Sequence, residues 1–356
     1  MYNSSRKGAV SVLLGVTMWL WVFLHASALK NCHPGCRCKV ENFGLFDSFS
    51  LTRVDCSGVG AGPVPIPIPL DTSSLDLSSS AISTITASML SGPGYTTLAS
   101  LDLSNNLISS LNGSTFSRLR YLETLDLSHN ALEELGHGCF SGLPLADVDL
   151  SSNRLRQVWL DIFTNKGHGG PIRIDLSNNF LTSVTRDPVK NPPNIQRLCL
   201  ARNRLNAVPR LQGLPLRSLS LDTNPIPRLE SDSFTGLRDL THLSLSGLFE
   251  LKTIQPHSFK DLCGLQVLDL SHNSHLGPLS EEVFGGLVAL QELNLSNSGV
   301  VSLPSNILHL LPGIRSIVLR EKVNCWKTQR QAQFHRHIGQ SNRGEELTCD
   351  VIGIVL

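Results

Sequence analysis

The sequence predicts a curved solenoid with a parallel β-sheet on the concave face, an irregular or 3-10 convex side, and a disulfide cap at each end. Three observations predict this fold: a period of about 24 residues, an asparagine at a fixed place in most repeats, and cysteine clusters at both ends. A repeat of that length cannot bury its own apolar face, so neighbouring repeats must stack to share one core.

The period is set by strand-like pairs of apolar residues, which recur 21 to 26 residues apart. The pairs begin at Leu75, Leu101, Leu125, Val148, Ile174, Leu198, Leu219, Leu243, Leu268, Leu293 and Ile317. Several repeats show the full pattern L-x-x-L-x-L-x-x-N-x-L, for example Leu98 to Ile108 and Leu122 to Leu132. This is the pattern of leucine-rich repeats, and it predicts about eleven of them over residues 71–320.

An asparagine follows most strands at the same offset. These residues are Asn106, Asn130, Asn153, Asn179, Asn203, Asn224 and Asn273, and serine replaces asparagine at Ser80 and Ser298. Where the chain leaves the strand its backbone groups lose their ladder partners, and a buried amide can satisfy them. We therefore predict a structural role for these residues. The segment Ser246–Glu250 fits neither the asparagine nor the leucine offset, so we expect an irregularity there, such as a bulge.

A phenylalanine recurs on the other side of several repeats, and these side chains are expected to form the convex part of the core. They are Phe116, Phe140, Phe163, Phe234, Phe259 and Phe284.

The first 28 residues indicate a secretory signal peptide. Arg6 and Lys7 precede an apolar run from Val10 to Leu24, and a small-residue site at Ala26 to Ala28 follows it. No later segment is long and apolar enough to insert into a membrane. We therefore expect the mature protein to be secreted into the extracellular space.

The cysteines predict caps over residues 29–70 and 321–356. Cys32, Cys36, Cys38 and Cys56 precede the first repeat, and four cysteines allow three pairings. A zinc cluster is the rival interpretation, but an oxidising compartment favours disulfides. Cys325 and Cys349 can bridge across the last loop. Cys139, Cys199 and Cys263 remain and are expected to be free thiols, buried or inert.

The candidate binding surface is the concave face. Residues between two inward positions of each strand point to that face, and several of them are acidic: Asp76, Asp102, Asp126, Asp149 and Asp175, with Asp147 beside them. Like charges on adjacent strands repel, so a cationic partner would gain by docking there. The alternative is that these aspartates only keep the face soluble. Beyond Arg173 and Arg197 the face becomes mixed in character.

Two sequons, at Asn112 and Asn294, predict N-glycosylation. A basic loop near the C-terminus is a candidate contact for glycosaminoglycan, or simply a solvated loop. Its basic residues are Lys327, Arg330, Arg336 and Arg343, with His335 and His337 among them.

No motif for catalysis or cofactor binding is present, so we expect neither an enzyme nor a cofactor. His272 and His275 have loose metal-ligand spacing, but His272 lies before an asparagine, as His129 does, and both are expected to be turn residues. A formal net charge of +1 argues against nucleic-acid binding.

Four stretches, together with the arrangement of the cysteines, resemble the small leucine-rich repeat proteoglycan family and its class IV-like members. The stretches are Asn42 to Cys56, Pro65 to Asp71, Gly92 to Leu98 and Phe116 to Glu123. The resemblance implies the pairs Cys32–Cys38 and Cys36–Cys56. It also implies an extracellular modulator of developmental signalling that acts by sequestration or competition. The partners that it implies are bone morphogenetic proteins (BMPs) with chordin, TGF-beta, and the Wnt receptor Frizzled. The alternative role is matrix assembly, through collagen or another fibrillar protein.

Overall fold

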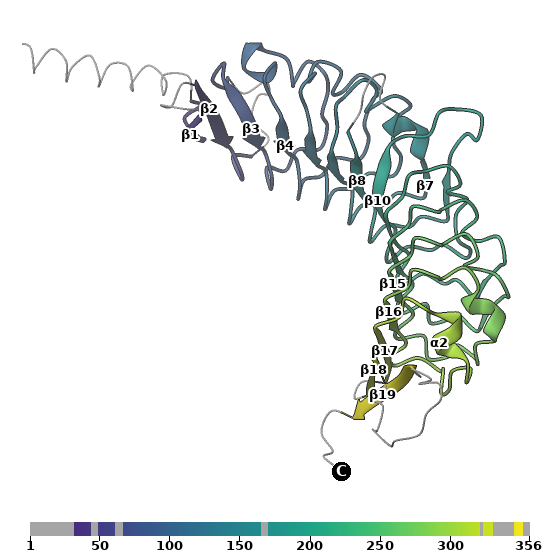
Figure 1. Ribbon diagram of the computed structural model, residues 1–356. Helices are drawn as coiled ribbons and strands as arrows, with labels where there is room; N and C mark the ends of the chain where they lie inside the picture. Colours follow the sequence, from purple (N-terminus) through teal and green to yellow (C-terminus); the bar gives the residue numbers. More distant parts are fainter. Residues whose placement is uncertain are drawn as a thin grey trace, which may run out of the picture.

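A computed structural model of the chain describes residues 32–43, 49–60, 67–164, 170–320, 323–329 and 345–351. For the last two ranges only the backbone is described. The predicted signal peptide, residues 1–28, lies outside the described residues. Figure 1 shows an arc in which the strands of one sheet line the inner side.

Eleven consecutive strands of this sheet in the described ranges pair in parallel, one for each predicted repeat. They are β3 (Thr72–Asp76), β4 (Ser100–Asp102), β5 (Thr124–Asp126), β6 (Asp147–Asp149), β8 (Ile172–Asp175), β10 (Ile195–Cys199), β11 (Ser218–Ser220), β13 (His242–Ser244), β15 (Val267–Asp269), β16 (Glu292–Asn294) and β17 (Ser316–Arg320). Each predicted apolar position pairs with its equivalent in the next strand, from Leu75 opposite Leu101 to Leu293 opposite Ile317. The predicted solenoid and its register are confirmed.

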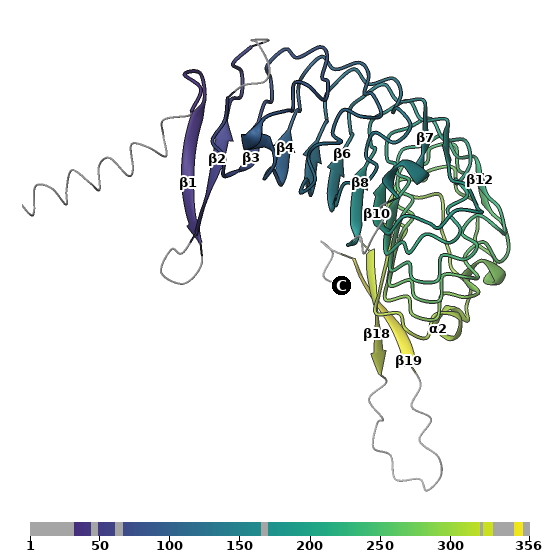
Figure 2. The same ribbon diagram turned by 90° about the horizontal axis from the view of Figure 1, so that it is seen from above.

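Antiparallel strands extend the sheet at both ends (Figure 2). At the N-terminal end, β1 (Arg37–Phe43) pairs antiparallel with β2 (Phe49–Asp55), and β2 pairs parallel with β3. At the other end, β17, β18 (Val323–Gln329) and β19 (Glu345–Val351) form antiparallel pairs. Because these additions cover the edges of the parallel sheet, they protect the core that the first and last repeats would expose.

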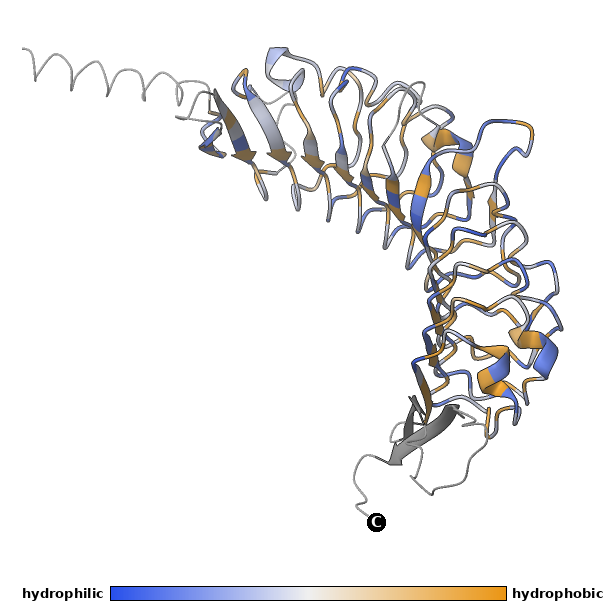
Figure 3. Ribbon diagram, in the orientation of Figure 1, coloured by the Kyte–Doolittle hydropathy of each residue, from blue (hydrophilic) through white to orange (hydrophobic). Residues whose placement is uncertain are grey.

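The core lies between the sheet and the convex segments, and its strand residues alternate in polarity along the sheet (Figure 3). The leucines of the repeat pattern are buried, for example Leu101, Leu125 and Leu243 at 1% exposure. On the convex side are 3-10 turns η2 (Pro93–Tyr95), η3 (Leu160–Phe163) and η4 (Glu281–Phe284), and a short helix α2 (Ile307–Leu310). Two small parallel pairs also lie there, β7 (Gln157–Trp159) with β9 (Ser183–Thr185) and β12 (Arg228–Leu229) with β14 (Thr253–Ile254).

The six predicted phenylalanines are buried, and five of them form two stacks. Phe140 lies 5.2 Å from Phe163 and 6.2 Å from Phe116 between ring centroids, and Phe234 stacks on Phe259 at 5.7 Å. The two repeats between Phe163 and Phe234 contribute no phenylalanine to the convex core, so the stacking is interrupted there.

The buried asparagines satisfy the backbone as predicted. The Asn153 amide donates to the carbonyls of Leu127 (2.9 Å), Leu150 (3.1 Å) and Ser151 (3.2 Å), and its Oδ1 accepts the Leu132 N–H at 3.0 Å. The residue before each asparagine adopts a left-handed backbone, as at His129 with φ 53° and His272 with φ 58°. These histidines are turn residues, as predicted.

The irregular segment after β13 departs from the repeat pattern only outside the sheet. The register from β11 through β13 to β15 has no shift, so the prediction of a bulge is wrong for the sheet itself. Gly247 takes the left-handed position with φ 64°, and Leu248 fills the asparagine position fully buried. From Leu248 to the next buried leucine, Leu251, the chain is one residue longer than the pattern N-x-L. A turn absorbs this residue, and in it the Leu251 N–H donates to the Leu248 carbonyl at 2.8 Å.

Candidate binding surface

The concave face carries an unbroken ladder of aspartates in its N-terminal half. The register places Asp76, Asp102, Asp126, Asp149 and Asp175 side by side on five consecutive strands. Asp55 on β2 is opposite Asp76 and extends the row to six. We call these six residues the aspartate ladder. Since adjacent strands lie about 4.8 Å apart, the ladder is about 24 Å long.

Each ladder carboxylate also closes a turn at the end of its strand. One oxygen accepts the backbone N–H of the serine two residues later, at 2.8 Å for the pairs Asp102–Ser104, Asp126–Ser128 and Asp149–Ser151. At Asp55, hydrogen bonds from both the side chain and the backbone of Ser57 lower the pKa of the carboxyl. Five of the ladder positions were predicted from the sequence, but their function in the turn was not.

The negative charge is not needed for the turn. Asn294 stands at the equivalent position of β16, opposite Asp269, and its Oδ1 accepts the Ser296 N–H at 3.0 Å. An uncharged amide therefore makes the same hydrogen bond. The ladder aspartates repel one another, although the turns do not require their charges. This negative charge beyond what the turns need is the feature that points to a ligand.

Asp147 does not belong to the ladder, although it lies on the same face. It precedes Val148 and stands opposite Arg173 of β8, whose guanidinium lies 3.7 Å from its carboxylate. This ion pair marks the boundary between an acidic and a basic part of the concave face.

Arginines gather directly beyond that boundary. Arg173 of β8 stands opposite Arg197 of β10, and Arg217 immediately precedes β11. These three residues and His242 line a hollow of about 460 Å³. Arg173 and Arg197 were predicted on this face from the sequence, but Arg217 was not, because it lies outside the strand positions that the repeat pattern marks.

The two sequons differ in surroundings. Asn112 is exposed in a turn, where its carbonyl accepts the Thr115 N–H. Asn294 is half-buried, and its side-chain oxygen is engaged by Ser296. Asn112 therefore offers the more accessible acceptor, and glycosylation at both positions stays a prediction.

The cysteines of the N-terminal cap form Cys32–Cys38 and Cys36–Cys56, the pairs that the family resemblance implied. At the other cap, the strand register sets Cys325 opposite Cys349. Their side chains, like those of the basic C-terminal loop, lie outside what the structure describes, so that bridge and the glycosaminoglycan contact stay predictions.

The remaining thiols are free, but they differ in exposure. Burial raises the pKa of Cys139 to about 12, and burial also raises the pKa of the half-buried Cys199. Cys263 is exposed, so of the two predicted alternatives, buried or inert, burial does not apply to this residue.

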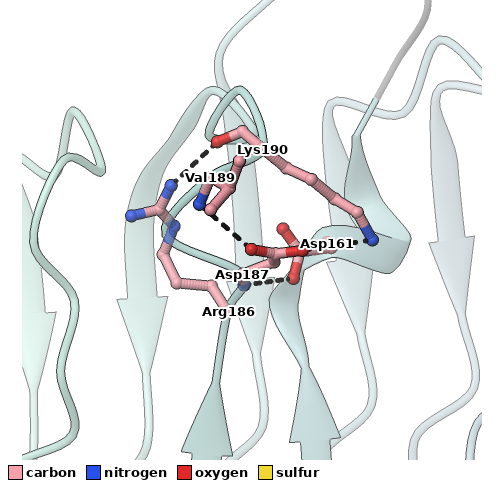
Figure 4. Close-up of polar contacts among 5 residues, drawn as sticks. All are labelled: Asp161, Arg186, Asp187, Val189 and Lys190. Carbon is pink, nitrogen blue, oxygen red and sulfur yellow. Dashed lines mark hydrogen bonds and ion pairs between the residues drawn. The ribbon is translucent and has the colours of Figure 1, made fainter.

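A polar cluster on the convex side bridges three repeats where the phenylalanine stacking is interrupted (Figure 4). Asp161 accepts the Asp187 N–H at 2.8 Å, Lys190 lies 3.7 Å from the Asp187 carboxylate, and Arg186 donates to the carbonyls of Lys190 and Gln212. These contacts tie successive convex loops together, and we assign the cluster a structural role.

Within the described residues, no group of three or more histidine, cysteine, aspartate or glutamate side chains is arranged to hold a metal ion. Among the helices of those same ranges, none has the length and hydropathy to span a bilayer.

Comparison with known proteins agrees with this architecture. The leucine-rich repeat family model matches residues 96–158, 214–274 and 249–300. The leucine-rich repeat domain of APL1 resembles this chain with a TM-score of 0.54 and 24% identity, covering 69% of this chain and 60% of that one. That likeness supports the fold alone.

Three relatives share most of their length with this chain. The chain is 58% identical to Tsukushi of Gallus gallus over 318 residues, which cover 89% of this chain and 86% of the relative. It is 51% identical to Tsukushi of Mus musculus (88% and 89% covered) and 50% identical to Tsukushi of Homo sapiens (89% and 90% covered). The chain therefore belongs to the Tsukushi family of leucine-rich repeat proteins.

Proposed function

We propose that this protein is a secreted, non-catalytic binding protein that modulates developmental signalling by sequestering ligands or competing for them. The partners proposed from the family resemblance are BMPs with chordin, TGF-beta and the Wnt receptor Frizzled. The observation that carries the proposal is the aspartate ladder on an open, rigid concave face.

The ladder suits a partner with a basic surface. Each of its carboxylates uses one oxygen for the strand-end turn, which leaves the second oxygen for a ligand. Exposed charges steer an oppositely charged partner and raise its rate of association more than they raise the affinity. The protein would then block a signalling ligand by holding it on the concave face, without catalysing a reaction on it.

The test compares soluble BMP, chordin, TGF-beta, a Frizzled ectodomain and fibrillar collagen on the immobilised, secreted full-length protein. We expect binding of at least one signalling protein, with an affinity that falls as salt rises, because salt screens exposed charges. Binding to collagen alone would instead favour the matrix role and overturn the proposal.

A charge variant locates the interface. Asp102→Asn, Asp126→Asn and Asp149→Asn together remove three charges but keep the turn hydrogen bonds, as Asn294 does. We expect at least a tenfold slower association. The matched control removes three exposed charges elsewhere, with Glu133→Gln, Glu134→Gln and Asp239→Asn, and should behave as the wild type. Equal effects of the two variants would exclude the ladder as the interface.

A further inference from the structure

We call the hollow lined by Arg173, Arg197, Arg217 and His242 the arginine hollow. The ladder aspartates close turns at the strand ends, but no comparable structural role explains these basic side chains. Arg173 has one ion pair, with Asp147 at 3.7 Å, and its side chain is 60% exposed. Within the described ranges, neither the Arg197 nor the Arg217 guanidinium has an ion pair or hydrogen bond, and both residues are exposed.

These basic side chains are close neighbours in the sheet. Arg173 and Arg197 are directly opposite on adjacent strands, and His242 is opposite Ser218, which follows Arg217. Like charges placed opposite each other destabilise a sheet. An anion bound between them would relieve this repulsion, and a guanidinium presents a planar set of donors suited to oxyanions.

The lining of the hollow indicates the class of anion. Its other residues are Gln196, Ser218 and Thr241, which offer hydrogen bonds, and Pro171. No phenylalanine, tyrosine, tryptophan or large aliphatic side chain lines it, so a protein segment would find arginines but no apolar anchor there. A ligand recognised by charge and hydrogen bonds along a polar surface fits this lining better than a protein segment does.

We propose that the arginine hollow binds a sulfated glycosaminoglycan. The site spans β8, β10, β11 and β13, in the middle of the arc in Figure 1. Three strand spacings of about 4.8 Å give a footprint of about 14 Å, which suits a short oligosaccharide segment. The aspartate ladder on one side repels a polyanion, so the chain runs along the edge where the strands begin, past Gln196, Arg217 and Thr241. The proposal is independent of which protein the ladder binds.

The test measures binding of a heparin-derived oligosaccharide to the secreted full-length protein by calorimetry. Arg197→Ser with Arg217→Ser should weaken binding at least tenfold. The matched control, Arg118→Ser with Arg120→Ser, removes the same charge from an exposed outer loop and should change binding less than twofold. Urea unfolding of each variant checks that the fold is retained, which is expected because all four side chains are exposed.

Two further arms separate the alternatives. Arg197→Lys with Arg217→Lys keeps the charge but loses the planar donors, and should give an intermediate loss. Polyglutamate and desulfated heparin of matched length should bind at least tenfold more weakly than heparin.

Two results would contradict the proposal. If the serine variant binds heparin as the wild type does, and Arg336→Ser with Arg343→Ser loses binding, the site lies in the C-terminal loop. Polyglutamate binding as tight as heparin would identify the ligand as an acidic protein segment. Either result overturns the proposal.

Discussion

At the residue scale, each ladder aspartate closes a turn at the end of its strand and also places a negative charge on the concave face. The sequence pattern placed them on the concave face because side chains alternate along a strand. It did not reveal the hydrogen bond to the serine two residues on, since that bond depends on the backbone at the strand end. Asp55 was missed because it lies beside Cys56, in a segment whose cysteines mark it as a cap.

Substitution of Asp126 separates the two functions. Asp126→Asn keeps an acceptor for the Ser128 N–H and removes repulsion from Asp102 and Asp149. We expect it to raise the free energy of unfolding at low salt by about 0.5 kcal/mol. Asp126→Ala should be less stable than Asp126→Asn by about 1 kcal/mol, because the turn hydrogen bond is lost. Urea unfolding at low and high salt measures both, and equal stabilities of the two variants would exclude a role in the turn.

Asn153 should be among the residues least tolerant of substitution outside the apolar core. Asn153→Ala leaves the carbonyls of Leu127 and Leu150 and the N–H of Leu132 without their side-chain partner. We expect a loss of about 3 kcal/mol in the free energy of unfolding, because unpaired buried groups cost about 1–3 kcal/mol each. The control is His129→Gly, at an exposed position with a left-handed backbone. Glycine relieves the backbone strain of the folded state but gives the unfolded chain more conformational entropy, and each effect is worth about 1 kcal/mol. The two effects nearly cancel, so the free energy of unfolding should hardly change.

The three free thiols should differ in reactivity, because the thiolate is the reactive form. Cys139 is protonated at pH 8, since burial raises its pKa to about 12, and should resist alkylation in the folded protein. The raised pKa of Cys199 makes it slow as well. Cys263 is exposed and should react first. Peptide mass mapping after brief iodoacetamide treatment checks this order, and rapid labelling of Cys139 would contradict its burial.

At the element scale, the strands were predictable and the connections were not. A period-two pattern fixes which side chains face inward, so Leu75 to Ile317 could be aligned from sequence alone. The repeat pattern indicated an irregularity at Ser246–Glu250 but not its form, the turn at Leu248. It gave no indication of the register shift between Ile195 and Arg197. The arginine hollow includes Arg217, which lies one residue before the strand positions that the repeat pattern marks, and so its place beside Arg197 was not predicted.

The phenylalanine stacks are the convex counterpart of the leucine core. Phe140 lies between Phe116 and Phe163 and is fully buried, so Phe140→Ala should reduce the free energy of unfolding by about 3–5 kcal/mol. Phe249→Ala is the matched control, since Phe249 is 51% exposed, and should cost less than about 0.5 kcal/mol. Urea unfolding checks the pair, and a small loss at Phe140 would mean that the convex side repacks easily.

At the scale of the whole molecule, the solenoid holds two charged regions at a fixed separation on one curved sheet. Each repeat contacts mainly its neighbours, so order along the sheet depends on the caps at its ends. The N-terminal cap is tied by Cys36–Cys56 to the start of the aspartate ladder, because Asp55 directly precedes Cys56. Loss of this disulfide is therefore expected to disturb the start of the aspartate ladder.

Replacing Cys36 and Cys56 with alanine should loosen the N-terminal repeats before the rest. The bridge closes a loop of sequence separation 20, and its removal should cost about 3 kcal/mol. Hydrogen exchange should accelerate in β2 to β4 and stay unchanged in β13 to β16, because stability in a solenoid is passed between neighbours. Loss of Cys32–Cys38, whose separation is only 6, should cost about 1 kcal/mol less and leave β3 protected. Uniform acceleration along all strands would mean that the solenoid opens as a single unit, and that the ladder and the arginine hollow are lost together.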